Sequence, residues 1–454
     1  MAFDSIIFAW TQRETRAGSK PAGIRGSLSC RVHIECAPLL NAPDRQKGGT
    51  RAQPVHRAQA VTRTIDLVYF NAGGGHRAAA TALETVIRAE QRPWQVRLVN
   101  LMKVLDPKDV FRKTTGMDWE DIYNNRLARG WSVGLAQELK LLQAAIRLSH
   151  RSMASRLRRH WRKAPPDLVV SLIPNFNRPM YEAVASLTPH VPYVTLLTDF
   201  ADYPPHFWIE PRQAQHFICG TPKAAAQARA LGYSEDRVHL TSGMIIRPDF
   251  YAAVEIDRRA ELRKLNLDPD RPTGLVMFGG HGSRAMQGIA KRLDDVQLII
   301  ICGHNKALAQ HLMLSSGAAR APRAVLGFTS QMRHYMQLAD FFIGKPGPGS
   351  ISEAVQQGLP VVVVRNTWTM PQERYNTDWV LENGAGIVLE SFRFVDAGVR
   401  SIIARLDEFK ANLARIENRA VFEIPQILER ILESRALHGS LPAAPAGRAA
   451  TLVH

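Results

Sequence analysis

Three glycine-rich loops could hold the phosphate groups of a substrate. They span residues 71–77, 279–283 and 344–350, and each directly follows a short apolar run. Glycine lets backbone amides approach an anion closely, and a loop that opens a helix points those amides at the anion. His76 lies in the first loop, and Glu353 follows the third loop by one helical turn. These features favour a nucleotide or another phosphorylated ligand.

None of the loops matches a standard nucleotide motif in full. The first is not Gly-x-Gly-x-x-Gly, and Asn100 stands where a dinucleotide-binding fold needs an acidic residue for the ribose. The third lacks the Gly-Lys-Ser/Thr ending of a P-loop, which disfavours ATP hydrolysis. A plainer interpretation of the first loop stays open: Gly73, Gly74 and Gly75 would form only a tight turn, with His76 as an exposed cap.

The loops lie in an alternating pattern of strands and helices. Short β-branched or apolar runs separated by helical stretches predict parallel sheets wrapped by helices. The pattern therefore predicts an α/β fold with two doubly wound domains. The expected strands are 65–70, 96–101, 168–172, 193–197 and 216–219 in the first domain, and 273–278, 296–302, 324–326, 341–343, 359–364 and 387–389 in the second.

We expect five segments along the chain. Residues 1–60 and 439–454 lack sustained periodicity and are interpreted as disordered tails. Residues 61–243 form an N-terminal domain and 244–416 a C-terminal domain. Residues 417–438 form a C-terminal helix that returns to the first domain.

The composition limits the partners and the compartment. Lys and Arg total 58 against 41 Asp and Glu, and the net charge of +17 attracts nucleic acid, acidic lipid or phosphorylated substrates. The four cysteines have no metal-binding spacing, and no run approaches the roughly 18 to 20 apolar residues that span a bilayer. We expect a cytoplasmic protein without a structural metal, at most peripheral on the inner face of the cell membrane.

Five motifs make a more specific comparison possible. They are Gly-Gly-Gly-His-Arg-Ala at 73–78, Ile-Ile-Cys-Gly-His-Asn-Lys at 300–306, Leu-Gly-Phe at 326–328, Lys-Pro-Gly-Pro-Gly at 345–349 and Pro-Gln-Glu at 371–373. Their order and spacing resemble the monogalactosyldiacylglycerol synthase family, part of glycosyltransferase family 28. That family is related to the peptidoglycan N-acetylglucosaminyltransferase that builds lipid II. The resemblance covers about residues 64–395. It implies a GT-B fold, in which two Rossmann-like domains face a central cleft.

The resemblance implies that the second domain binds a UDP-sugar donor and the first domain binds the acceptor and the membrane. For two donor residues a plainer role stays open: Phe328 could simply pack in the core, and Asn376 could be a solvated helix residue. The implied contacts are Gly280, Ser283, Gly347, Gly349 and Ser350 with the diphosphate, Glu353 with the ribose, Phe328, Thr329 and Met332 with the uracil, and Gln372, Glu373 and Asn376 with the sugar hydroxyls.

Members of the family are inverting enzymes, which implies a general base for the acceptor hydroxyl. His76 is the first choice, because a helix N-terminus should keep its imidazole neutral. Asp199, at the end of an expected strand, is the second choice. Asp199 could instead cap the segment that follows it.

Residues 139–163 predict a basic amphipathic helix. An apolar stripe that includes Ile146 and Trp161 lies beside a basic stripe, so the helix could lie on an anionic membrane. An ordinary surface helix that packs its apolar stripe on the domain is the alternative, and both can hold together. The basic stripe consists of Lys140, Arg147, Arg151, Arg158 and Arg162.

The resemblance implies transfer of galactose or glucose from a UDP-sugar to diacylglycerol, which would make a membrane glycolipid. The UDP-sugar is then a substrate, and no cofactor or metal is expected. One alternative is N-acetylglucosamine transfer to another lipid, of the lipid II or lipopolysaccharide type. A nucleotide-sugar mutase or epimerase of related fold is another. A basic nucleic-acid-binding protein is the alternative from a different class, although no recognition motif supports it.

Overall fold

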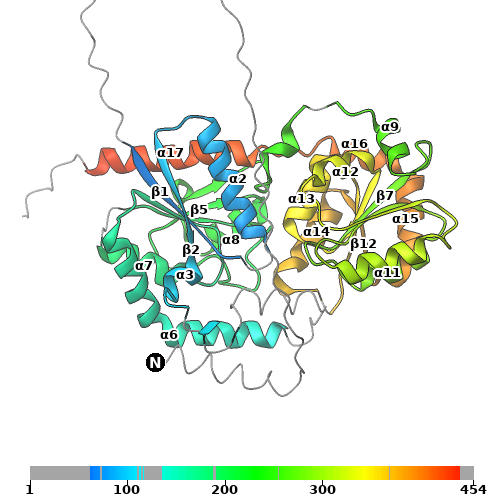
Figure 1. The fold of residues 1–454 in the computed structure, drawn as a ribbon. Helices are drawn as coiled ribbons and strands as arrows, with labels where there is room; N and C mark the ends of the chain where they lie inside the picture. Colours follow the sequence, from blue (N-terminus) through cyan, green and yellow to red (C-terminus); the bar gives the residue numbers. More distant parts are fainter. Residues whose placement is uncertain are drawn as a thin grey trace, which may run out of the picture.

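The computed structural model describes residues 62–71, 74–109, 112–113, 116, 135–187, 191–253, 255–367 and 369–439. The expected tails lie outside these residues, apart from Gly439. Two lobes lie side by side, each with a central sheet between helices (Figure 1).

Six described strands form the N-terminal sheet in the order β2-β1-β3-β4-β5-β6, and every pair is parallel. Helices cover both faces, which explains why β3, β4 and β5 are buried along their whole length. The strands are β1 (Arg63–Tyr69), β2 (Trp94–Asn100), β3 (Leu168–Ser171), β4 (Tyr193–Leu196), β5 (His216–Cys219) and β6 (Val238–Leu240).

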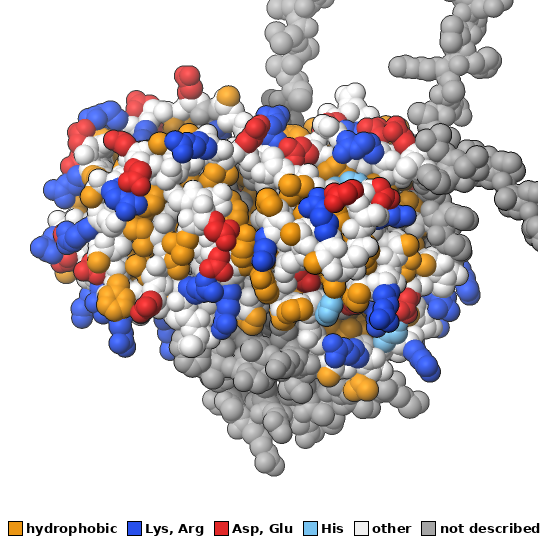
Figure 2. Space-filling view, turned by 180° about the vertical axis from the view of Figure 1, so that it is seen from behind, with side chains coloured by type: hydrophobic (Ala, Val, Ile, Leu, Met, Phe, Trp, Pro, Cys, Tyr) orange, Lys and Arg blue, Asp and Glu red, His pale blue; other side chains and the backbone are white. Residues whose placement is uncertain are grey.

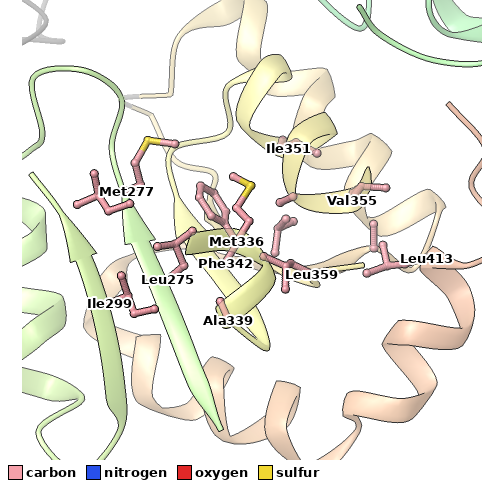
Figure 3. Packing of buried hydrophobic residues seen from close by; sticks show 14 of the residues in the cluster. Leu275, Met277, Ile299, Met336, Ala339, Phe342, Ile351, Val355, Leu359 and Leu413 are labelled. Atoms are coloured by element: carbon pink, nitrogen blue, oxygen red, sulfur yellow. The ribbon is translucent and has the colours of Figure 1, made fainter. Parts of the chain in front are cut away.

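The C-terminal sheet also has six described strands, all parallel, in the order β12-β11-β10-β7-β8-β9. On one face, apolar side chains of the sheet meet those of α12 and α13, among them Leu275, Phe342, Met336 and Ile351 (Figure 3). The strands are β7 (Thr273–Met277), β8 (Gln297–Ile301), β9 (Arg323–Leu326), β10 (Phe341–Gly344), β11 (Val361–Val364) and β12 (Gly386–Leu389).

The helices connect successive strands, as a doubly wound fold requires. Around the N-terminal sheet they are α2 (Gly75–Ala89), α3 (Leu101–Leu105), α6 (Leu135–Lys163), α7 (Asn177–Leu187) and α8 (Pro222–Ala230). In the C-terminal lobe they are α9 (Arg258–Lys264), α10 (Ala285–Arg292), α11 (Lys306–Ser316), α12 (Met332–Leu338), α13 (Pro348–Gln356), α14 (Arg374–Glu382), α15 (Val395–Ala404) and α16 (Leu406–Leu413).

The two parallel sheets confirm the predicted α/β, doubly wound architecture. Most strand ends lie within one or two residues of the expected positions. The strand β6 was not predicted. It has only three residues, and of these only Val238 is buried, so it leaves no apolar run in the sequence.

The chain crosses twice between the lobes, and the two crossings are bonded together. The amide of Arg419 donates to Ser242 Oγ at 2.7 Å, and the side-chain amide of Asn418 donates to the Met244 carbonyl at 2.9 Å. The last helix, α17 (Ala420–Gly439), then lies along the N-terminal lobe beside α2 (Figure 1). Its apolar side chains, such as Leu428, join the N-terminal core.

The basic helix α6 buries its apolar stripe and leaves basic side chains outside. Ile146, Leu157 and Trp161 lie in the N-terminal core with strands β1 to β3, so the helix packs on the domain as an ordinary surface helix does. The side chains of Arg147, Arg151, Arg158 and Arg162 are exposed, whereas that of Lys140 lies outside the described residues. Across the described residues, no helix is apolar and long enough to cross a membrane.

A buried carboxylate fixes the end of α6. Asp66, on β1, is fully buried and accepts two hydrogen bonds from the Arg97 guanidinium, at 2.5 and 2.9 Å. The indole of Trp161 donates a third, at 2.9 Å. These bonds offset the loss of hydration and hold the basic helix against β1 and β2.

We expect Asp66→Asn to lower the free energy of unfolding by about 2–3 kcal/mol, because a buried ion pair loses one partner while Arg97 stays partly hydrated. Urea titration followed by circular dichroism measures the change. Asp294→Asn is the control, since its pair with Arg320 is exposed to solvent and should contribute little to stability. Equal effects of the two substitutions would contradict this role of Asp66.

Candidate active site

The strand order of the C-terminal sheet indicates where a ligand can bind. The neighbours β7 and β10 are not consecutive in the chain, so the winding direction reverses between them. In open parallel sheets, ligands bind outside the carboxyl ends of the strands at such a reversal. The loops after β7 and β10 are the second and third glycine-rich loops of the sequence, so the fold brings them together.

Close backbone contact explains the glycines beside β7. Gly279 and Gly282 have φ angles of 73° and 62°, and Gly303, after β8, has a φ of 60°. A Cβ on Gly303 would lie 2.2 Å from the carbonyl oxygen of Gly280, to which the His304 amide donates at 2.8 Å. The loop after β8 therefore fixes the backbone of Gly280. Ser283 lies at the end of this loop, where its Oγ accepts from the amide of Ala285.

The loop after β10 opens the helix α13. Gly347 is its N-cap residue, and the exposed Gly349 and half-buried Ser350 lie in its first turn. Unpaired amides and the helix dipole favour an anion at this end. Glu353 lies further along the same helix, and Arg247, between the lobes, lies 3.8 Å from its carboxylate. Burial raises the pKa of Glu353 to about 7, although the Arg247 charge opposes this shift.

An aromatic pair borders a groove near these loops. The rings of Phe328 and His304 stack with centroids 4.2 Å apart, and the Phe328 side chain is 63% exposed. The alternative that Phe328 packs in the core is therefore wrong. A groove of about 330 Å³ runs along this pair. Thr329 binds the amide of Gln331 through its hydroxyl, and Met332 packs against the C-terminal core.

The loop after β11 brings three polar side chains towards the same region. Asn376 is fully buried and donates to the Pro346 carbonyl at 2.8 Å, so the solvated-helix alternative is wrong. Its Oδ1 is buried and has no hydrogen-bond partner among the described residues. Glu373 is buried and pairs with Lys345 at 3.5 Å. Gln372 is half-buried and bonds the sulfur of Met370.

In the N-terminal lobe, Asp199 follows β4 and is nearly buried. It accepts a hydrogen bond from the indole of Trp208 at 2.9 Å. The turn that follows is held by another carboxylate, Asp202, which accepts from the amides of His206 and Trp208. Burial raises the pKa of Asp199 to about 7. Nearby Glu373 adds to this rise, while the Trp208 bond and the Lys345 charge oppose it.

In the N-terminal sheet the winding direction reverses between the neighbours β1 and β3. His76 lies in the loop and helix start that follow β1 at this point. Its Nδ1 is 2.7 Å from the Leu172 carbonyl, which can only accept, so Nδ1 carries the proton and Nε2 is free to accept. The side chain is half-buried against Phe70 and Trp208, and is therefore not an exposed cap. Burial, opposed by the Leu172 bond, lowers its pKa to about 4. Gly74 and Gly75 begin the helix beside it, and Gly73 lies outside the described residues.

Contacts between the lobes align these groups. The rings of Phe200 and Trp379 lie 4.9 Å apart, and those of Tyr203 and Tyr375 lie 6.4 Å apart. The segment that carries Asp199 therefore packs on α14, the helix that directly follows Glu373. Asp199 is therefore close enough to Glu373 and Lys345 for their charges to act on its carboxyl group.

Sequence reasoning missed four residues of this region: Arg247, Lys345, Trp208 and His304. Arg247 and Trp208 lie outside the glycine motifs, so no local signal marks them. Lys345 and His304 stand inside motifs that were recognised, but their neighbours across the sheet are not visible from the sequence. In the part of the chain that the structure describes, no cluster of three or more His, Cys, Asp or Glu side chains could hold a metal ion.

Comparison of the sequence with known proteins indicates the family of the C-terminal lobe. The profile of the glycosyltransferase family 28 C-terminal domain matches residues 275–431, which include both donor loops and the loop after β11. The chain contains a glycosyltransferase family 28 C-terminal domain over residues 275–431. It is an enzyme, a glycosyltransferase with the GT-B fold.

Two plant proteins show the similarity over most of the sequence. A probable monogalactosyldiacylglycerol synthase 2 of Oryza sativa subsp. japonica is 28% identical over 424 residues, with 86% of this chain and 85% of the relative covered. The monogalactosyldiacylglycerol synthase 2 of Arabidopsis thaliana is 27% identical, with 82% of each covered. Both are described as chloroplastic.

Solved structures share the fold of this glycosyltransferase. MurG of Acinetobacter baumannii has a TM-score of 0.54 at 13% identity, and the match covers 81% of this chain and 99% of that one. MnaA of S. aureus, solved with UDP, has a TM-score of 0.53 at 14% identity, with 85% and 100% covered. At these identities the likeness shows the architecture alone.

The contact between the loops after β7 and β8 predicts the effect of Gly303→Ala. The new Cβ cannot fit beside Gly280, and a positive φ costs a non-glycine residue about 1–2 kcal/mol. We expect the affinity for UDP to fall by roughly tenfold or more as the loop shifts. Gly288→Ala, on α10 with open space around it, is the control and should keep its affinity. Calorimetric titration with UDP gives both values, and an unchanged affinity in Gly303→Ala would contradict the account.

Glu353 and His76 should affect different steps. Glu353→Ala should weaken UDP binding by about tenfold to a hundredfold, because a hydrogen bond to a charged group contributes about 1.5–3 kcal/mol. His76→Ala should leave UDP affinity unchanged and lower turnover, because His76 lies in the other lobe. UDP titrations together with initial rates measure the two effects. Equal losses of UDP affinity would refute this division.

Proposed function

We propose that this enzyme transfers a hexose, galactose or glucose, from a UDP-sugar to diacylglycerol with inversion at the anomeric carbon. The glycine loops at the β7–β10 reversal support a diphosphate between them, with Glu353 on the ribose and the exposed Phe328 ring beside the uracil. The unpaired Oδ1 of buried Asn376 supports a sugar hydroxyl at that position. The similarity to plant monogalactosyldiacylglycerol synthases supports diacylglycerol as the acceptor.

The geometry favours Asp199 over His76 as the general base. A base works best when its pKa lies near the working pH, and burial places the pKa of Asp199 at about 7 but that of His76 at about 4. Asp199 also lies in the segment that packs on α14, opposite the sugar-binding loop. In this proposal Asp199 takes the acceptor proton, and Nε2 of His76 accepts a hydrogen bond from the acceptor.

The exposed side of α6 supports binding to an anionic membrane surface, on the inner face of the cell membrane. Arg147, Arg151, Arg158 and Arg162 are exposed along this helix, and each contributes about 1 kcal/mol near an anionic surface. The side chain of Leu148, between them, is 74% exposed and could enter the lipid interface. A lipid acceptor would then be reached without a membrane span.

The charge distribution gives little support to nucleic-acid binding. On the face seen in Figure 2, Lys and Arg alternate with Asp and Glu, and the basic side chains do not gather into one stripe. A nucleic-acid footprint needs a basic stripe, and the one on α6 is accompanied by no nucleic-acid recognition motif in the sequence. We also propose that no cofactor takes part, because the diphosphate of the donor already activates the sugar.

The direct test is transfer of labelled sugar to diacylglycerol in anionic vesicles, with UDP-galactose, UDP-glucose and UDP-N-acetylglucosamine offered in parallel. We expect a glycolipid product from galactose or glucose, and activity that survives a chelator. A product from UDP-N-acetylglucosamine alone would contradict the donor assignment. No product from any donor would contradict the acceptor.

The pH dependence distinguishes the two candidate bases. A general base must be deprotonated, so kcat at saturating donor should fall about tenfold per pH unit below pH 7 if Asp199 acts, but only near pH 4 if His76 acts. Saturation removes the effect of Glu353, which titrates in the same range. We expect the fall near pH 7 in the wild type and in His76→Ala. Asp199→Asn should lower kcat by about 10²–10⁴-fold, and a wild-type profile flat to pH 5 would rule out Asp199.

A further inference from the structure

Lys345 belongs to the loop after β10 and reaches the loop after β7, and no donor contact described above involves it. It directly follows β10 and precedes Gly347, the N-cap of α13. A Cβ on Gly347 would lie 3.4 Å from Lys345 Cε and 3.9 Å from its Nζ, and one on Gly279 would lie 3.9 Å from the same Cε. The aliphatic part of the side chain therefore contacts both glycine loops, at the point where the sheet reverses.

The Lys345 side chain is partly exposed, and its ammonium group has one ion-pair partner among the described residues. Its Nζ lies 3.5 Å from Oε1 of Glu373, a long contact for an ion pair. The Lys345 side chain is 40% exposed, whereas that of Glu373 is 8% exposed. The buried Glu373 carboxylate thus holds the Lys345 ammonium group, while part of the lysine side chain stays accessible to solvent. The Lys345 charge also acts on Asp199 of the N-terminal lobe, where it opposes the rise in that group's pKa.

The charge balance of the reaction shows what this cation can do. When the acceptor oxygen bonds the anomeric carbon, the bond from that carbon to the β-phosphate oxygen breaks. Its electron pair stays on the phosphate, and the acceptor proton moves to the general base. The departing UDP therefore gains one negative charge. Positive groups fixed where such a charge develops are among the largest contributions to catalysis.

We propose that Lys345 is a catalytic residue that contacts the β-phosphate and stabilises UDP as it leaves. The amides at the N-terminus of α13 act on the same phosphate, and Glu373 positions the ammonium through Oε1. Glu373 Oε2 then remains for a hydroxyl of the sugar. This inference rests on the proposed sugar transfer. The simpler role for Lys345 is to neutralise Glu373, which would affect folding or sugar binding but would not act selectively on UDP.

The test compares Lys345→Met, which keeps the side chain out to Cε but removes the ammonium group, with Lys345→Arg, which keeps a charge. Lys264→Met is the matched control, because Lys264 is an exposed lysine of the same lobe paired with Glu261. Single-turnover transfer from UDP-galactose gives the rate of the chemical step. Calorimetry with UDP, and separately with uridine, gives the affinities with and without the diphosphate.

For Lys345→Met we expect a rate about 100-fold lower, as for loss of one stabilising group in an oxyanion site. UDP should bind about tenfold more weakly, with uridine affinity unchanged, which also shows that the variant is folded. Lys345→Arg should recover most of the rate, and Lys264→Met should match the wild type.

A rate for Lys345→Met within about threefold of the wild type would overturn the inference. Equal weakening of UDP and uridine would also overturn it, because the site would then be distorted as a whole. The binding measurements need no acceptor. They test Lys345 even if the wild type transfers no sugar to diacylglycerol, a result that would refute the proposed function instead.

Discussion

The candidate donor site depends on the pairing of β7 with β10. Phe341 to Gly344 lie in parallel register with Gly274 to Met277, so the two strands end at the same level. Each strand then continues into a glycine-rich loop, and the two loops face one anion site because no strand separates them. Residues 67 positions apart in the sequence meet for this reason. A Cβ on Gly344 would lie 2.6 Å from the Met277 carbonyl, so even the strand ends need a glycine.

A further constraint on the candidate site is that its carboxyl groups lie in buried or partly buried positions. Asp199, Glu353 and Glu373 carry carboxyl groups with little access to water, and each loss of hydration has to be offset. The structure provides an indole for Asp199, Arg247 for Glu353 and Lys345 for Glu373. The pKa values of Asp199 and Glu353 are nevertheless raised to about 7, because burial outweighs these partners. A site of this kind is prepared to bind hydroxyl groups and phosphate and to accept a proton.

Much of the fold could be predicted from the sequence. Eleven of the described strands show apolar or β-branched runs, since parallel strands covered on both faces must be apolar. The short edge strand β6 has no such run. The positions of the glycine loops after β7 and β10, and of Glu353 on the helix that follows, could also be predicted, whereas their contacts with a nucleotide stay predictions.

Other features of the site depend on contacts that no local pattern reveals. The sequence placed His76 first as the base because it begins a helix, but its pKa is lowered mainly by burial near Phe70 and Trp208. For Asn376, implied as a sugar contact, a solvated helix position had stayed open, and its burial follows from the packing of α14 under the loop after β10. The partners of Asp199 and Glu353 come from segments that carry no motif.

The central claim is that the nucleotide binds in the C-terminal lobe, between the loops after β7 and β10. Hydrogen–deuterium exchange with and without UDP tests it directly. We predict that UDP slows exchange at the amides of residues 279–283 and 347–353, with no change at 74–78 in the N-terminal lobe. Protection at 74–78 without protection of the two C-terminal loops would contradict the account.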